Sequence, residues 1–167
     1  MSKEIEISTN GQDINEKIDE LEVALLANFE MANCPLKHEF VPGMYMRQIT
    51  MDKGQKITSL IHKTYHPYFI LKGEVKVFSE NEGTKILKAG DWGITTPNTR
   101  RVLYIQQDTI WVTCHPTSIQ PTGDSEEEIE EAVRKVGEQI IDWRENILLG
   151  GVVKNNVLVE SSSNLTY

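Results

Sequence analysis

The chain has 167 residues, of which 39% are hydrophobic and 25% charged, and its formal net charge is −8 at pH 7. This length and composition are typical of one globular domain with additional terminal segments. The acidic excess argues against a nucleic-acid partner, because neutralising phosphates requires clustered Lys and Arg.

Residues 1–33 are expected to form an arm followed by an amphipathic helix. Four apolar residues recur at steps of four, three and four, which is the spacing of a heptad seam: Ile14, Ile18, Leu21 and Leu25. Glu, Lys, Leu and Ala, which favour helices, are frequent between them. Two arrangements are open from the sequence. The helix lies on the rest of its own chain, or the four residues form an oligomer seam with other copies.

Residues 34–118 are expected to form β-strands, because turn signals recur at short intervals, as at Pro42-Gly43, Lys72-Gly73 and Ala89-Gly90-Asp91. Strand-like runs lie between the turns, at residues 44–51, 57–61, 68–71, 75–79, 86–87, 102–105 and 109–114. Many short strands with frequent turns indicate a sandwich or a barrel.

Residues 119–167 are expected to form a second amphipathic helix and a tail. Asp124 or Ser125 is a candidate N-cap, and the three glutamates that follow favour the positive end of a helix dipole. One face of this helix is apolar: Ile129, Val133, Val136, Ile140 and Trp143. We expect the helix to end near residues 146–149 and the tail to form a hairpin around residues 155–156.

Two motifs in the β region carry a resemblance to a known family. The first places Gly54, Leu60, His62, His66 and Gly73 at the spacing of the first cupin motif. The second runs from Gly90-Asp91 to Pro97-Asn98 with one extra residue. Residues 54–115 thus resemble the cupin superfamily, and more narrowly its small, mostly uncharacterised members from bacteriophage and bacterial genomes. The resemblance implies a mainly β fold: a jelly-roll-like double-stranded β-barrel, here with a helix on each side of it in sequence.

The metal site that the family implies is incomplete in this chain. The first motif normally supplies His-x-His and then Glu to one metal, but Leu60 holds the first His position and His66 the Glu position. Val102 stands where the second motif has its last His. If residues 62–66 are a strand, His62 and His66 share one face, and His115 is a candidate third ligand on the last strand. One divalent transition metal is the candidate cofactor. The alternative is that these histidines hydrogen-bond inside a polar barrel.

A ligand pocket is a second candidate site, with Tyr68, Arg101 and Tyr104 as its residues. Arg100-Arg101 would present a guanidinium to a carboxylate or phosphate. The alternative for these two arginines is a surface ion pair with the abundant acids.

These observations predict a non-enzymatic structural or assembly protein, within a virion if the narrower resemblance holds. The incomplete ligand set is the reason for leaning away from an enzyme. The alternatives are a metal-dependent isomerase or oxygenase and a metabolite- or sugar-binding module. Expected partners are copies of the chain or other structural chains, with a small molecule as a further candidate. Neither an apolar leader nor a membrane-spanning stretch is visible, so we expect synthesis in the cytoplasm, no signal-peptide secretion and no membrane insertion.

Overall fold

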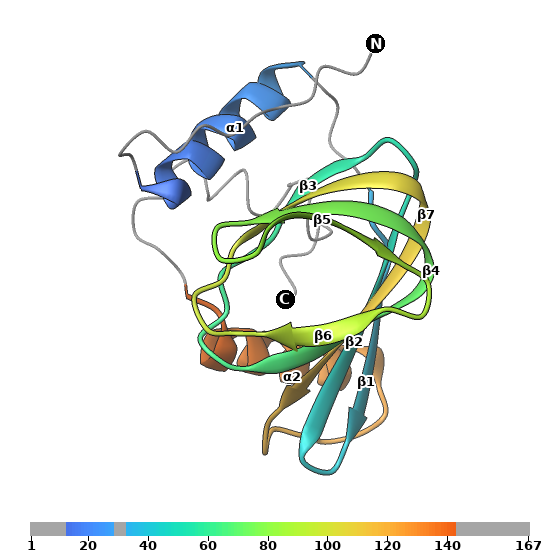
Figure 1. The fold of residues 1–167 in the computed structure, drawn as a ribbon. Coiled ribbons are helices and arrows are strands. Elements are labelled where there is room, and N and C mark those ends of the chain that lie inside the picture. The colour runs from blue at the N-terminus through green and yellow to red at the C-terminus, as the bar shows by residue number, and fades with distance from the viewer. Residues whose placement is uncertain (1–12, 29–32, 143–167) are drawn as a thin grey trace.

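The computed structural model describes residues 13–28 and 33–142. Seven strands within these residues form one antiparallel sheet that curls around a common interior, with one helix before and one after it in sequence (Figure 1). The mainly β fold class with two helices is as expected. In chain order the elements are α1 (Ile14–Asn28), β1 (Leu36–Val41), β2 (Met44–Met51), β3 (Lys56–Thr58), β4 (His66–Ser79), β5 (Gly83–Lys88), β6 (Trp92–Thr95), β7 (Arg101–Pro116) and α2 (Glu126–Ile140).

Two long strands, β4 and β7, organise the sheet. They pair with each other along most of their length, and the path of the sheet is β1-β2-β7-β4-β5. The two ends of β7 also pair with β2 and β3, while the two ends of β4 pair with β6 and β5. Each was expected as two short strands. A bulge near Gly73 joins the halves of β4, and a Cβ at this glycine (φ 93°) would clash with the Asp108 carbonyl oxygen.

Alternating burial along the strands builds the core, because successive side chains of a strand point to opposite faces. Residues 44–51 of β2 alternate strictly between half-buried and buried side chains. The main core is a cluster of buried side chains from α1, residue 34 and strands β2 to β5 and β7, including Leu25, Ile49, Val75, Ile105 and Trp111.

The helix α2 closes one end of the barrel. Ser125 caps it through a reciprocal pair of hydrogen bonds with Glu128, as one of the two expected N-caps. Its apolar face packs on Leu60 and Tyr45 in a second core cluster. The helix ends at Ile140, earlier than expected, because Ile141 has an extended backbone and the next amide, of Asp142, donates to the Ile61 carbonyl at 2.8 Å. The expected helical position of Trp143 and the hairpin around residues 155–156 lie outside the described residues.

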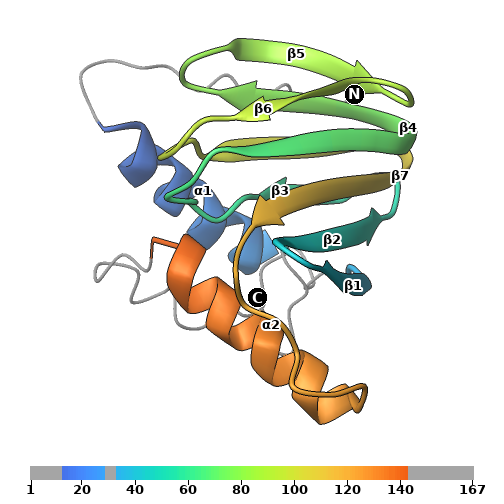
Figure 2. The same ribbon diagram turned by 90° about the horizontal axis from the view of Figure 1, so that it is seen from below.

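The helix α1 packs on its own chain. Ile14, Ile18 and Leu25 are buried, and Leu21 is half-buried against the main core. The four residues of the expected seam are therefore covered to a large extent by this chain itself, which is the first of the two arrangements left open. Their use as an oligomer seam stays a prediction that requires α1 to leave the barrel. Figure 2 shows α1 and α2 on the side of the barrel away from β5.

Candidate functional site

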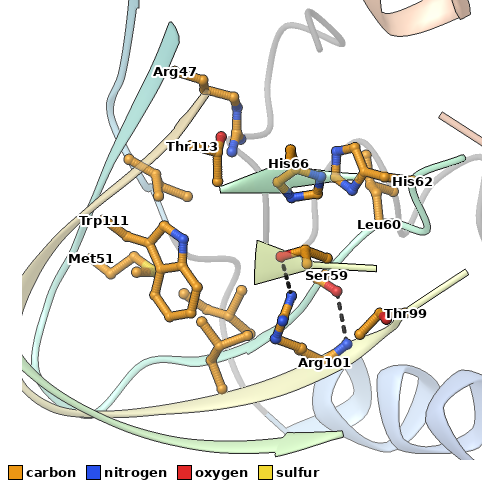
Figure 3. A pocket seen from close by; sticks show the side chains of 14 residues that line it. Arg47, Met51, Ser59, Leu60, His62, His66, Thr99, Arg101, Trp111 and Thr113 are labelled. Carbon is orange, nitrogen blue, oxygen red and sulfur yellow. Dashed lines mark hydrogen bonds between the residues drawn. The ribbon is translucent and has the colours of Figure 1, made fainter. Parts of the chain in front are cut away.

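The three histidines singled out from the sequence come together inside the barrel. Their ring centroids are 4.7 Å apart for His62 and His66, 4.5 Å for His66 and His115, and 5.3 Å for His62 and His115. All three side chains are buried. His66 begins β4, His115 lies near the end of β7, and His62 lies in the segment between β3 and β4. Figure 3 shows His62 and His66 side by side at one end of the cavity.

The route by which His62 reaches this cluster differs from the expected one. Residues 59–65 do not form a continuous strand, so His62 and His66 do not share a strand face. The backbone of His62 is held instead by an isolated bridge to Ile141 and by the Asn98 amide, which donates to its carbonyl at 2.8 Å. The end of α2 and the turn before β7 therefore position this histidine.

Burial keeps the imidazoles neutral near pH 7. Burial is the main reason that the pKa of His66 is lowered to about 4; the Thr64 carbonyl opposes this effect, and the charges of Arg101 and Arg47 add to it. Burial and neighbouring cations likewise place the pKa values of His62 and His115 well below the usual range. The His66 Nδ1 lies 3.3 Å from the Thr64 carbonyl oxygen, which can only accept, so this nitrogen carries the proton.

A cavity of about 60 Å³ lies beside the histidines and is lined by two buried arginines, Arg47 and Arg101. The guanidinium of Arg101 donates from Nη1 to the Thr95 hydroxyl at 2.9 Å. Its backbone amide donates to the Ser59 hydroxyl at 2.8 Å, and its Cζ lies 5.1 Å from the centre of the Tyr68 ring. Figure 3 shows Arg101 on one side of the cavity and His62 and His66 on the other.

The expected pocket residues divide between the two faces of the sheet. Arg101 lines the cavity, whereas Tyr68 is buried behind it, between Arg101 and Trp111, and supports the guanidinium. Tyr104 was placed wrongly. It is half-buried on the opposite face of β7, where the Lys56 ammonium lies 4.9 Å from its ring centre. Residues 101 and 104 differ by an odd number of positions, so they cannot share a face of a regular strand.

The alternative of an ion pair with the acids is confirmed for Arg100, but not its surface location, since the side chains of Arg100 and Arg101 are both buried. Arg100 donates to Asp19 at 2.7 Å and to Glu22 at 2.6 Å, and so ties α1 to the start of β7. Arg47 was missed. Its signal in the sequence is an arginine at an inward position of β2, between the apolar residues Tyr45 and Ile49.

The side chains around the histidines do not fit a metal ion well. No group of three or more His, Cys, Asp or Glu side chains within residues 13–28 and 33–142 is arranged to hold one. Leu60, at a usual ligand position, lines the cavity with an aliphatic side chain, which cannot bind a metal, and also packs in the apolar cluster under α2. His38 does not belong to the cluster; its Nδ1 is 2.6 Å from the Tyr45 hydroxyl. Metal ligation by His62, His66 and His115 stays a prediction, and we derive no chemistry from it.

No family model matches the sequence, and no curated protein matches it either. Its structural neighbours are cupin and double-stranded β-helix proteins, mostly uncharacterised, at low sequence identity. An uncharacterised Klebsiella pneumoniae protein with a double-stranded β-helix domain is 20% identical with a TM-score of 0.44, over 50% of this chain and 76% of its own. An RmlC-like cupin from Methanocaldococcus jannaschii is 12% identical with a TM-score of 0.44, over 52% and 82%. A cupin-2 domain protein from Shewanella frigidimarina is 8% identical with a TM-score of 0.43, over 64% and 95%.

These similarities concern the fold alone, and no activity is transferred from them. Neither helix in the described part of the chain is long and apolar enough to cross a membrane.

Proposed function

We propose that this chain is a non-enzymatic cupin-fold protein that assembles with copies of itself through the outer face of its sheet. We define the outer face as the outward side chains of β6, β4, β7, β2 and β1. The observation that carries the proposal is a group of large apolar side chains exposed there. Trp92 is 67% exposed, Leu71 58%, Ile94 51% and Phe69 37%.

The strand register places these side chains next to one another. Trp92 is opposite Phe69, and Phe69 is opposite Val112 of β7. The row continues through Gln48 of β2 to Lys37 of β1. Five strands spaced about 4.8 Å apart make a face about 20 Å wide. A groove of about 310 Å³ runs along it. An exposed apolar patch of this kind on a sheet marks an interaction site.

A second copy is the partner that this face fits best. A standard interface buries about 800 Å² per partner and has an apolar centre with a polar rim. The outer face has this anatomy, because β1 adds the exposed pair Lys37 and Glu39, whose charged groups are 3.7 Å apart. A net charge of −8 repels copies of the chain in general. This rim carries both signs, so the opposite charges of two copies can pair there.

The setting of the assembly rests on the sequence resemblance alone. From the narrower resemblance we expect a bacteriophage particle, with other structural chains as further partners.

Light scattering coupled to size exclusion tests the proposal over a range of protein concentrations. The wild-type chain is expected to form an oligomer. The double variant Trp92→Glu with Ile94→Glu is expected to be a monomer by light scattering and folded by circular dichroism. The control is Val23→Glu, which places one such charge on an apolar side chain of α1 that is 40% exposed. It should leave the mass unchanged. The proposal would be refuted if the wild-type chain were a monomer, or if the double variant had the same oligomeric mass as the wild-type chain.

A further inference from the structure

The cavity inside the barrel has a chemistry that self-assembly does not use. Its polar lining consists of guanidinium, imidazole and hydroxyl groups, and its described lining residues include no Asp or Glu. We propose that this cavity binds a small oxyanion, such as a carboxylate or inorganic phosphate.

The buried charge of Arg101 is the first step of the argument. Its residue is 5% exposed. The exposed Glu82 carboxylate interacts with its guanidinium electrostatically, but none of the ion pairs among the described residues involves Arg101. The Nε atom is buried and makes no hydrogen bond. A buried charge without a close counterion is costly, so an anion in the cavity would recover part of that cost. A guanidinium also presents its donors in a planar fork that matches two oxygens of an oxyanion.

Two hydroxyls next to this guanidinium complete a set of donors. Thr95 accepts from Arg101 Nη1, and Ser59 accepts from the Arg101 amide. Among the hydrogen bonds of the described residues, these two hydroxyls only accept, so each has a hydrogen left to donate. Both residues line the cavity. Arg101, Thr95 and Ser59 therefore form one wall with several donors and positive charge.

The opposite wall favours an anion over a cation. Arg47 lies there and is 4% exposed. It lowers the pKa of each of the three histidines, which places its charge near them. A metal cation would meet two guanidiniums, whereas an anion would be attracted by both.

The volume limits the ligand to a few heavy atoms. About 60 Å³ is room for roughly four to six water-sized spheres, since one water needs about 10–15 Å³ by this measure. Acetate, with four heavy atoms, and phosphate, with five, are of this size. Sugars and nucleotides are larger than the cavity.

Calorimetric titration and thermal unfolding of the full chain test this inference, with sodium phosphate and sodium acetate as probes. Sodium chloride at matched ionic strength is the reference. One saturable site is expected for at least one oxyanion, together with a rise in the unfolding midpoint that chloride does not produce. The two oxyanion arms distinguish phosphate from carboxylate as the ligand. If neither oxyanion binds beyond the effect of chloride, the inference is wrong.

Variants identify the wall that binds. Thr95→Val keeps the shape and the buried charge but removes one donor, and should weaken binding several-fold. Arg101→Met should weaken it at least about tenfold, because hydrogen bonds to a charged group contribute about 1.5–3 kcal/mol each. Without anion, the same variant should unfold at an equal or higher temperature, since a buried charge is removed. Arg134→Gln, at an exposed arginine of α2, is the matched control and should bind normally.

Two other outcomes would overturn the inference. One is normal oxyanion binding by Arg101→Met. The other is one equivalent of Zn²⁺ or Ni²⁺ bound by the unchanged chain and lost in His66→Ala, with no oxyanion bound. Failure of self-assembly is a separate result, because the Trp92→Glu and Ile94→Glu variant changes only the outer face. As a folded monomer it should bind the oxyanion unchanged.

Discussion

The ion pairs of Arg100 provide the sharpest test of how α1 is attached to the barrel. The Arg100 side chain is 4% exposed and donates to Asp19 at 2.7 Å and to Glu22 at 2.6 Å. Glu22 is itself 8% exposed by side chain and accepts from the Thr58 hydroxyl at 2.5 Å. Replacing Arg100 by Met therefore leaves a buried carboxylate without its cation.

The expected loss follows from the burial of each partner. Breaking a buried pair costs about 3–5 kcal/mol, whereas an exposed pair contributes about 0–1 kcal/mol. Glu22 belongs to the first class, and Asp19, with 29% of its side chain exposed, is closer to the second. We expect Arg100→Met to lower the free energy of unfolding by about 3 kcal/mol.

A double-mutant cycle separates the ion pair from lost packing. In Arg100→Met with Glu22→Met both charges are gone, so the double variant should unfold within about 1 kcal/mol of the unchanged chain. Urea unfolding gives the free energy of unfolding of each variant. A smaller dependence of this free energy on urea concentration would show that α1 has detached before the barrel unfolds. A loss below about 1 kcal/mol in Arg100→Met would refute the buried-pair argument.

Three further predictions concern acid stability, a bulge and a helix cap. Burial lowers the pKa of His66 from 6.5 to about 4. The unfolded chain therefore binds this proton first, and stability present above about pH 6.5 is lost as pH falls towards 4. Between pH 7 and 5, His66 should account for a fall of about 2 kcal/mol in the free energy of unfolding. The urea midpoint of His66→Gln should therefore fall less over this range than that of the wild-type chain. An equal dependence of the two midpoints on pH would contradict this prediction. Gly73→Ala should lower the free energy of unfolding by more than about 2 kcal/mol, since its Cβ would meet the Asp108 backbone. Gly43→Ala, with open space around it, should lower it by only about 1 kcal/mol. Equal shifts of the thermal unfolding midpoint in the two variants would disprove the close contact at Gly73. Ser125→Ala should lower the free energy of unfolding, measured in urea, by about 1 kcal/mol, because it removes the cap of α2. Ser125→Asp should keep the stability of the wild-type chain, because aspartate also caps helices. Equal stability of the two variants would exclude a role for the cap.

The barrel could be predicted because its signals are local. Turns depend on one or two residues, and strand alternation has a period of two, so both are visible in a short window of sequence. The same alternation shows that Arg101 and Tyr104 face opposite ways. The extent of β4 was not predictable in this way, because its two halves are joined by a bulge at Gly73 that depends on contact with Asp108.

The candidate site was predicted only in part. His62, His66 and His115 do converge, although the end of α2 and a loop, not a shared strand, position His62. Arg47 and Ser59 were not singled out, because each reaches the cavity from a segment with no motif of its own. Their approach to Arg101 depends on how strands distant in sequence pair.

The sequence by itself determined most of the strands and turns, the start of α2 and the apolar stripe of α1, all of which follow from neighbours a few residues apart. It did not indicate β1 or β6 as strands. Only the tertiary structure decided what that stripe packs against and which charge the barrel encloses. A heptad pattern is the same whether its partner is its own barrel or another copy. The buried Arg100 pairs and the cationic cavity depend on distances between segments far apart in the chain, and electrostatic energy depends directly on those distances.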